Sequence, residues 1–481
     1  MENNHKASSS SSPNIVMIPS PGMGYLIPLV ELAKLLVHHH NFTITFIIPT
    51  IGPPPKPHEN LLQSLPTSIN HFFLPPIDFH DLPPETKTVT KITLAVTRSL
   101  PKICNVFESL VANSSVVGLV VDLFGTDAFD VAKEFNVPSY LFWSSMAMGL
   151  ILLLHLPKLD KMVSCEYKDM DEPVKLPGCF PISGAEFPEP LQDRKSEAYK
   201  WFLQYGKRVD LAEGVLLNSF MELEPDAIKT LQDEIGLCGP PVYPVGPIIQ
   251  TGPSYGPGGH ECLKWLDEQA RGSVLFVSFG SGGTLSFEQL NALALGLEMS
   301  GTEFLWVVYF SSSATASNAA FFSVQSQTDP LGFLPKGFTE RTRSLGRGLL
   351  VPSWAPQSEV LSHGSIGGFL SHFGWNSILE SIANGVLLIA WPLYAEQKMN
   401  ANVLCEGLKV ALRPKANENG MVGCEEICRV VKELMEGEEG FRVRERMNGW
   451  KKAANKALSE EGSSIKALSE LVMKLKKQAW N

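Results

Sequence analysis

The segment from Trp354 to Gln397 holds most of the side chains that could bind a polar ligand. Trp354 offers a flat face for a ring, and carboxylates suit the paired hydroxyls of a diol. A helix that begins near Asn376 would present N–H donors and a favourable dipole to a phosphate. The candidate binding residues of this segment are Trp354, Ala355, Gln357, His372, Trp375, Asn376, Ser377, Glu380, Glu396 and Gln397.

These residues also have ordinary structural explanations. Ser377 and Glu380 have the spacing of a capping box, which would occupy both side chains locally. Gly385 suits the end of a helix, Trp391 suits a core position, and a lone histidine such as His372 is usually structural. Any one member could be structural, but the joint spacing of the set favours a binding site.

A turn of small residues at 278–284 is a second candidate phosphate site. It lies between an apolar run and a helical stretch that Ser286 and Gln289 would cap and Gly301 would end. Small residues, Ser281 among them, let backbone N–H groups approach an anion. Taken alone, a plain tight turn explains this segment equally well.

Short apolar runs alternate with helical segments along the chain, which predicts an α/β fold with parallel sheets covered on both faces. We expect strands at 14–19, 43–48, 116–121, 140–143, 273–278, 304–309, 348–351, 367–370 and 386–391. Two such domains in one chain would face each other across a cleft. Because ligands bind beyond the carboxyl ends of parallel strands, the turns after these strands should line that cleft.

The chain of 481 residues is too long for one ordinary core, and its proline- and glycine-rich breaks and shifts in composition predict five parts. Residues 1–13 are a polar tail that we expect to be disordered. Residues 14–240 form one Rossmann-like domain, 241–259 a linker rich in proline and glycine, and 260–460 a second Rossmann-like domain. A charged helix at 461–481 is expected to pack back on the first domain.

The segment from Trp354 to Gln397 closely resembles, over its full length, the sugar-nucleotide signature of plant family 1 UDP-glycosyltransferases. The resemblance covers nearly the whole chain and is strongest to the arbutin synthase, or hydroquinone glucosyltransferase, type, which residues 121–129 and 394–401 match well. It implies a GT-B fold in which the first domain binds an acceptor and the second binds UDP-glucose. It further implies transfer of glucose, with inversion, to a small phenolic or alkaloid-type plant metabolite, without a metal.

The resemblance assigns roles within the donor site. Trp354 would stack on uracil, Gln357 would lie by the base and ribose, and Glu380 would accept from the ribose hydroxyls. The diphosphate would meet His372, Asn376, Ser377 and, from the other side, Ser281, and the sugar hydroxyls would meet Trp375, Glu396 and Gln397.

The turn from Pro19 to Tyr25 departs from the family at its catalytic position. Relatives carry a histidine there that removes the proton of the acceptor hydroxyl, with an aspartate to orient it; here these positions hold Tyr25 and Asp122. A free phenol titrates at about 10, so Tyr25 should be a poor base at neutral pH. General-base assistance is worth roughly 10²- to 10⁴-fold, so we expect retained UDP-sugar binding with much weaker transfer to ordinary alcohols. Weak transfer to acidic phenols or thiols could persist, because these acceptors need less help.

The sequence leaves several roles open for Tyr25 and Asp122. Asp122 could act as the base itself, Tyr25 could hydrogen-bond Asp122 and silence it, or Tyr25 could be a packing substitution. The pair could instead serve a repurposed proton-transfer reaction, or the protein could bind UDP-sugars without catalysis. His80 could reach the cleft, although a surface position is the better prediction.

Other aromatic residues bear on the shape of the pocket. Phe124 and Trp143 are candidate acceptor-binding residues, and Phe142 and Met146 could also stack on an aromatic acceptor, although residues at such positions are more often core. Phe373 stands where the family usually has cysteine, and a phenyl ring there could overpack the donor site.

Composition narrows the class of partner. The formal net charge of −10 argues against nucleic acid as the main partner. The longest apolar run, at 146–156, is too short to cross a bilayer, and the eight cysteines lack metal-site spacing. We therefore expect a cytoplasmic monomer that binds a nucleotide sugar and a small-molecule acceptor, with no metal and no membrane insertion.

Overall fold

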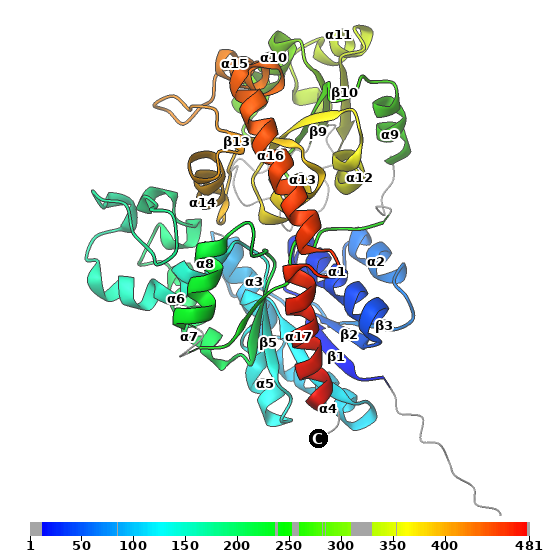
Figure 1. The fold of residues 1–481 in the computed structure, drawn as a ribbon, viewed down its shortest axis with the longest axis vertical. Helices are drawn as coiled ribbons and strands as arrows, with labels where there is room; N and C mark the ends of the chain where they lie inside the picture. Colours follow the sequence, from blue (N-terminus) through cyan, green and yellow to red (C-terminus); the bar gives the residue numbers. More distant parts are fainter. Residues whose placement is uncertain are drawn as a thin grey trace, which may run out of the picture.

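The computed structural model describes residues 12–83, 85–235, 239–252, 259–280, 282–283, 285–308, 330–352 and 354–478. Within them the chain forms two parallel sheets, each flanked by helices and placed one above the other along the long axis (Figure 1). The predicted pair of Rossmann-like domains is confirmed. Most of the predicted tail at 1–13 lies outside the described residues.

The first sheet has seven strands in the order β3-β2-β1-β4-β5-β6-β7. Its strands are β1 (Asn14–Ile18), β2 (Thr43–Ile48), β3 (Ile69–Phe73), β4 (Val116–Val121), β5 (Ser139–Trp143), β6 (Gly214–Leu217) and β7 (Val242–Pro244). Its helices are α1 (Met23–His40), α2 (Lys56–Gln63), α3 (Thr88–Thr97), α4 (Leu100–Asn113), α5 (Ala128–Glu134), α6 (Ala147–Met162), α7 (Glu197–Arg208) and α8 (Pro225–Thr230). The strand order reverses between β1 and β4, which opens a crevice beyond their carboxyl ends.

The second sheet has six strands in the order β10-β9-β8-β11-β12-β13 and reverses between β8 and β11. Its strands are β8 (Val274–Ser278), β9 (Glu303–Val308), β10 (Gly348–Pro352), β11 (Ile366–Ser371), β12 (Leu387–Ala390) and β13 (Ala411–Leu412). Its helices are α9 (Gly259–Asp267), α10 (Phe287–Ser300), α11 (Phe338–Ser344), α12 (Gln357–Ser362), α13 (Trp375–Asn384), α14 (Gln397–Asn402), α15 (Cys424–Glu436) and α16 (Glu438–Ala457).

The linker predicted from residue 241 is wrong at its start. Val242–Pro244 is strand β7, and its register is fixed because Val215 N donates to Pro241 O at 2.9 Å and Val245 N donates to Leu217 O at 2.9 Å. Proline is tolerated there because β7 is an edge strand, whose outer N–H groups have no ladder partner. The chain therefore leaves the first sheet after β7.

The last helix, α17 (Ser463–Gln478), lies on the first domain although it follows the second in sequence (Figure 1). Its apolar face packs against β1, β4 and β7, and Ser464 Oγ donates a hydrogen bond to Gly246 O. On that face Leu475 lies directly over Gly118 of β4, where an added Cβ would come within 3.0 Å of it. The chain thus crosses between the domains a second time after α16.

Local helix signals also have observable outcomes. Ser286 Oγ accepts from Gln289 N at 3.2 Å, and Gly301 ends α10 with a φ of 71°, so the serine cap and the glycine stop are confirmed. The reciprocal half of the capping box is wrong, because the Gln289 side chain bonds the main chain of Val422 instead. Gly385 ends α13 with a φ of 73°, as predicted. None of the described helices combines the length and the apolar character that crossing a bilayer requires.

Candidate functional site

A cavity of about 490 Å³ lies between the two domains and draws its walls from both. Its position follows from topology, because the turns after β1, β4, β8 and β11 all end at it. Apart from Met146 and His80, the predicted site residues that the structure describes line this cavity: Tyr25, Asp122, Phe124, Trp143, Trp354, Ala355, Gln357, His372, Trp375, Asn376, Ser377, Glu380, Glu396 and Gln397. Ser281 lies outside the described residues.

Gln357 donates hydrogen bonds to Ser377 and Glu380, the two residues that the sequence could also explain as a capping box. Its Nε2 donates to Glu380 Oε2 at 2.7 Å and to Ser377 Oγ at 3.0 Å. The helix begins at Trp375 with Gly374 as its N-cap, so Ser377 is not the capping residue and the capping-box alternative is wrong. Burial, with a smaller contribution from the nearby Glu31, raises the pKa of Glu380 to about 7.

The N-terminus of α13 points its backbone donors toward the cavity. Gly374 provides no capping side chain, which leaves the first N–H groups of the helix for a ligand. Trp375 Nε1 donates to Asn218 O at 2.7 Å, and Asn376 Nδ2 donates to Gly24 O at 3.0 Å. Both side chains therefore connect the domains, so Trp375 has only its backbone N–H to offer to a ligand.

His372 lies between two glycines at the end of β11. A Cβ at Gly280 or at Gly374 would come within 2.6 Å of its ring, so the glycines make room for the imidazole. Burial lowers the pKa of His372 to about 4, and its Nδ1 has no hydrogen-bond partner among the described residues. At neutral pH the ring is uncharged and can give a ligand one N–H donor.

The segment before α14 forms the next part of the wall. Gln397 Oε1 accepts from Leu393 N at 2.8 Å and Tyr394 N at 3.0 Å, which leaves the amide NH₂ of Gln397 available to a ligand. Burial raises the pKa of Glu396, whose Oε1 receives a 3.5 Å hydrogen bond from Asn400 Nδ2. This segment therefore offers one donor group and one acceptor group side by side.

Phe373 does not overpack the donor site as the sequence suggested. Its side chain is fully buried in the core and does not line the cavity. The residue adopts a φ of 67°, and its carbonyl accepts from Asn400 Nδ2 at 3.0 Å. The phenyl ring is thus packed away from the site, and Phe373 is not among the residues that line the cavity.

Tyr25 and Asp122 meet the cavity from neighbouring turns but are not joined to each other. The Tyr25 ring packs edge-on against Phe124, with 5.5 Å between ring centroids and an interplanar angle of 79°. Burial, and then the charges of Asp122 and Glu396, raise the pKa of Tyr25 well above its ordinary value of 10.0. No hydrogen bond links Tyr25 to Asp122 in the part of the chain that the structure describes.

The donors on Asp122 come from Ser20 and Phe124. Asp122 Oδ2 accepts from Ser20 N at 2.6 Å, and Oδ1 accepts from Ser20 Oγ at 2.5 Å and from Phe124 N at 3.1 Å. These donors lower the pKa of Asp122, but burial outweighs them and raises it to about 6. The alternative in which Tyr25 silences Asp122 by a hydrogen bond is therefore wrong.

The acceptor end of the cavity is apolar, and more residues line it than the sequence indicated. Phe124, Phe142 and Trp143 line it, but the prediction for Met146 is wrong because that side chain is fully buried and only its carbonyl is used, by Trp143 Nε1. His80 is 95% exposed and does not line the cavity. The sequence reasoning missed Ile92, Leu152, Leu153, Leu191, Phe202, Tyr394 and Met399.

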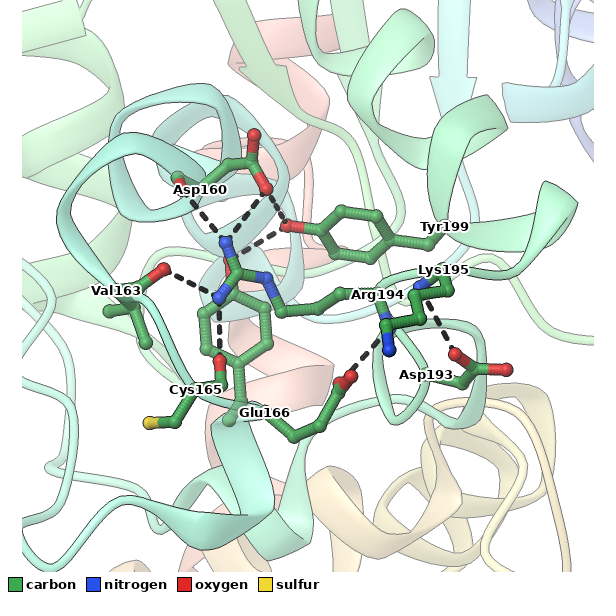
Figure 2. Close-up of polar contacts among 9 residues, drawn as sticks. Asp160, Val163, Cys165, Glu166, Asp193, Arg194, Lys195 and Tyr199 are labelled. Carbon is green, nitrogen blue, oxygen red and sulfur yellow. Dashed lines mark hydrogen bonds and ion pairs between the residues drawn. The ribbon is translucent and has the colours of Figure 1, made fainter.

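Part of the acceptor wall comes from the long connection between α6 and α7, which Arg194 holds in place (Figure 2). Its guanidinium donates to Val163 O and Cys165 O, each at 2.5 Å, and to Asp160 O at 2.8 Å. It also pairs with Asp160 Oδ1 at 3.0 Å, and Tyr199 OH donates to the same oxygen at 2.6 Å. One cation thus fixes the end of α6 and the segment that leads into α7.

The same connection is attached to the second domain. Glu189 N donates to Ala395 O at 2.8 Å, and Arg413 Nη1 pairs with Glu186 Oε2 at 2.9 Å. Residues 188–191 line the cavity on one side of this contact, and Ala395 and Glu396 line it on the other. The acceptor wall and the segment that carries Glu396 therefore contact each other directly.

Known proteins have a similar sequence and architecture. Residues 255–439 match the family model described as UDP-glucoronosyl and UDP-glucosyl transferase. A hydroquinone glucosyltransferase from Rauvolfia serpentina is 59% identical over 463 residues, which cover 96% of this chain and 98% of that protein. The chain belongs to the plant family 1 UDP-glycosyltransferases. The resemblance to the hydroquinone glucosyltransferase type is thereby confirmed.

Solved structures of other plant UDP-glycosyltransferases superpose on the whole chain. Phytolacca americana UGT2, complexed with UDP-2fluoro-glucose and pterostilbene, has a TM-score of 0.88 and 53% identity, and covers 97% of this chain and 100% of that one. A UDP-glucosyltransferase from Polygonum tinctorium capable of glucosylating indoxyl, in complex with 3,4-dichloroaniline, has a TM-score of 0.89 and 50% identity, with coverage of 98% and 100%. The GT-B fold is confirmed, and the chain is a glycosyltransferase whose donor is a UDP-sugar.

The last feature of this UDP-glycosyltransferase is the distribution of its potential metal-ligating side chains. Across the described ranges, no three histidine, cysteine, aspartate or glutamate side chains gather where a metal ion could bind. The groups that face an anion in the cavity are the α13 N-terminus and His372.

Proposed function

We propose that this protein transfers glucose from UDP-glucose to the hydroxyl of a small phenol, with weak general-base assistance. The relatives support the phenolic acceptor, since one is a hydroquinone glucosyltransferase and the Phytolacca structure holds UDP-2fluoro-glucose with pterostilbene. The cavity of about 490 Å³ has the size of a small-molecule site, and its first-domain wall is largely aromatic and aliphatic.

On this proposal the second domain holds the donor. Trp354 stacks on the uracil, and Glu380 accepts hydrogen bonds from the ribose hydroxyls beside Gln357. The α13 N-terminus and the neutral His372 donate to the diphosphate, which stabilises the charge that develops as UDP departs. Glu396 and the free NH₂ of Gln397 bind the hydroxyls of the sugar.

The environment of Tyr25 carries the weak-base part of the proposal. A phenol whose pKa lies above 10.0 is almost wholly protonated at neutral pH and removes no proton from an alcohol. The acceptor must therefore supply much of its own acidity. A repurposed proton-transfer reaction by Tyr25 and Asp122 is less well supported, since no hydrogen bond couples the two described side chains.

The test is a rate series with UDP-glucose and substituted phenols of graded acidity, with an aliphatic alcohol at the weak end. We expect glucoside formation to rise steeply with acceptor acidity and the aliphatic alcohol to react no faster than a boiled control. Calorimetry with UDP on the same preparation separates binding from turnover. UDP binding without any glucoside would replace the transferase by a non-catalytic binding protein, and rates independent of acceptor acidity would contradict weak base assistance.

A further inference from the structure

We propose that Asp122, and not the residue at position 25, receives the proton of the acceptor hydroxyl during transfer. This inference rests on the proposed glucosyltransferase function. Position 25 carries a group that stays protonated, while Asp122 is one of two carboxylates, with Glu189, that line the cavity from the first domain, and the one that lies beside Tyr25 and Phe124.

Access to Asp122 follows from the packing of Tyr25. The Tyr25 ring lies edge-on against Phe124, which in turn packs against Tyr205 with 5.8 Å between ring centroids. This aromatic cluster accounts for the orientation of the phenol without any contact to the carboxylate. Asp122 is 2% exposed and is one of the residues that line the cavity, so an acceptor hydroxyl would meet its carboxylate at the cavity wall beside the Tyr25 phenol.

Asp122 is held in a fixed position by its neighbours at the switch point of the sheet. It ends β4, and Ser20 follows β1, the adjacent parallel strand. Ser20 N donates to Oδ2, Ser20 Oγ and Phe124 N donate to Oδ1, and the backbone of Gly125 is a further donor that lowers the pKa of the carboxyl. We place the accepted proton on Oδ2, which receives fewer of the three direct hydrogen bonds than Oδ1.

The charge state of Asp122 suits a modest base. With a pKa of about 6, it is ionised at neutral pH yet more basic than an exposed aspartate. The titratable groups that face this region are Tyr25 from α1, Tyr205 from α7, Glu189 from the connection between α6 and α7, and Glu396 with Tyr394 from the second domain. Burial raises the pKa of all three tyrosines, so none of them is a competing base near neutral pH.

The transfer step needs only the acceptor, UDP-glucose and Asp122. The acceptor oxygen forms a bond to C1 of glucose while the bond from C1 to the β-phosphate oxygen breaks. UDP leaves with the electron pair of that bond, and the acceptor proton passes to Asp122 Oδ2. The proton returns to solvent when the glucoside leaves, which restores the carboxylate for the next cycle.

The first test compares wild type, Asp122→Asn and Tyr25→Phe in pH profiles of kcat/KM with hydroquinone. Wild type should show an ascending limb with a midpoint near 6, and Tyr25→Phe should keep that limb. Asp122→Asn should lose the limb and roughly 10²-fold or more of kcat, while UDP affinity by calorimetry stays at the wild-type value. Asp130→Asn, an exposed carboxylate on α5, is the matched control and should behave as wild type.

A nitrophenol that is already ionised separates chemistry from damage to the fold. With that acceptor, Asp122→Asn should lose less than about 10-fold, because no proton has to be removed. Ser20→Ala provides a second variant that keeps the carboxylate. It removes a donor that lowers the pKa of Asp122, so the midpoint of the limb should move to higher pH.

The outcomes separate this inference from the proposed function. An Asp122→Asn variant with the wild-type rate and limb would overturn the role of Asp122, and so would loss of the limb in Tyr25→Phe. An unmoved midpoint in Ser20→Ala would assign the limb to another group, such as Glu396, and also overturn it. A wild-type protein that makes no glucoside from any phenol would instead remove the proposed function itself.

Discussion

A Tyr25→His variant places an imidazole where the cavity now holds a phenol with a pKa above 10.0. At pH 7.5, less than about 0.3% of such a phenol is ionised, whereas about 90% of an ordinary imidazole is an unprotonated base. The population of available base at this position therefore rises roughly 300-fold. This lies within the roughly 10²- to 10⁴-fold range of general-base assistance, so we expect kcat with hydroquinone to rise by about 10²-fold.

The same substitution has a structural cost that must be measured alongside the rate. It removes the edge-on contact between Tyr25 and Phe124, which is worth roughly 0.5–1.5 kcal/mol beyond area burial. Thermal unfolding should therefore show a modest loss of stability with no change in UDP affinity. Tyr25→Phe is the matched control, because it keeps the ring and adds no base.

The assay is the initial rate of glucoside formation at pH 7.5 across phenols of graded acidity. The gain from Tyr25→His should be largest for the weakest acid and should vanish for a phenol that is already ionised. A folded variant that binds UDP normally yet transfers no faster than wild type to any acceptor would refute the assignment of position 25 as the missing base.

Three further substitutions test the donor site and the acceptor wall. Because the pKa of Glu380 is about 7 in the folded protein and 4.5 in the unfolded chain, the folded state binds the extra proton and loses stability as pH rises through this window. The change in unfolding free energy caused by Glu380→Gln should therefore be more favourable at pH 8 than at pH 5, by at most roughly 3 kcal/mol in denaturation experiments. The same substitution should weaken UDP binding in calorimetry. Arg413→Gln breaks the half-buried ion pair with Glu186 and should change stability by less than about 1 kcal/mol, but should raise KM for the acceptor. Arg194→Met leaves the carbonyls in Figure 2 without their donor and should cost roughly 3 kcal/mol of unfolding free energy, with a higher acceptor KM and unchanged UDP affinity. Equal effects of Arg194→Met on acceptor and UDP binding would contradict its placement at the acceptor wall alone.

The fold was predictable where strands are buried on both faces. Runs such as 43–48 and 116–121 are continuous in apolar residues because helices cover both sides of each sheet, and the observed strands agree with every predicted run to within one residue. The strands that escaped prediction are β3, β6, β7 and β13. β3 lies at an edge and exposes Asn70, while β7 and β13 are only three and two residues long, so neither leaves a periodic pattern.

The donor wall was also predictable, but the acceptor wall was not. Residues from Trp354 to Gln397 converge because they follow β10, β11 and β12, whose carboxyl ends lie at the same edge of the second parallel sheet. Ile92 and Phe202 come from separate helices and have the same apolar character as core residues, so no signal marks them as pocket residues. The orientation of Phe373 depends on a left-handed backbone that residue type alone does not reveal.

The position of α17 has a consequence for how the protein is made. One face of the first sheet, including Ile15 and Val117, is covered by Leu471 and Leu475, which leave the ribosome after the whole second domain. A nascent chain that has completed β7 therefore still exposes this apolar face. The first domain cannot bury it until about 200 further residues have been translated. Chaperone engagement during synthesis should concentrate on this interval.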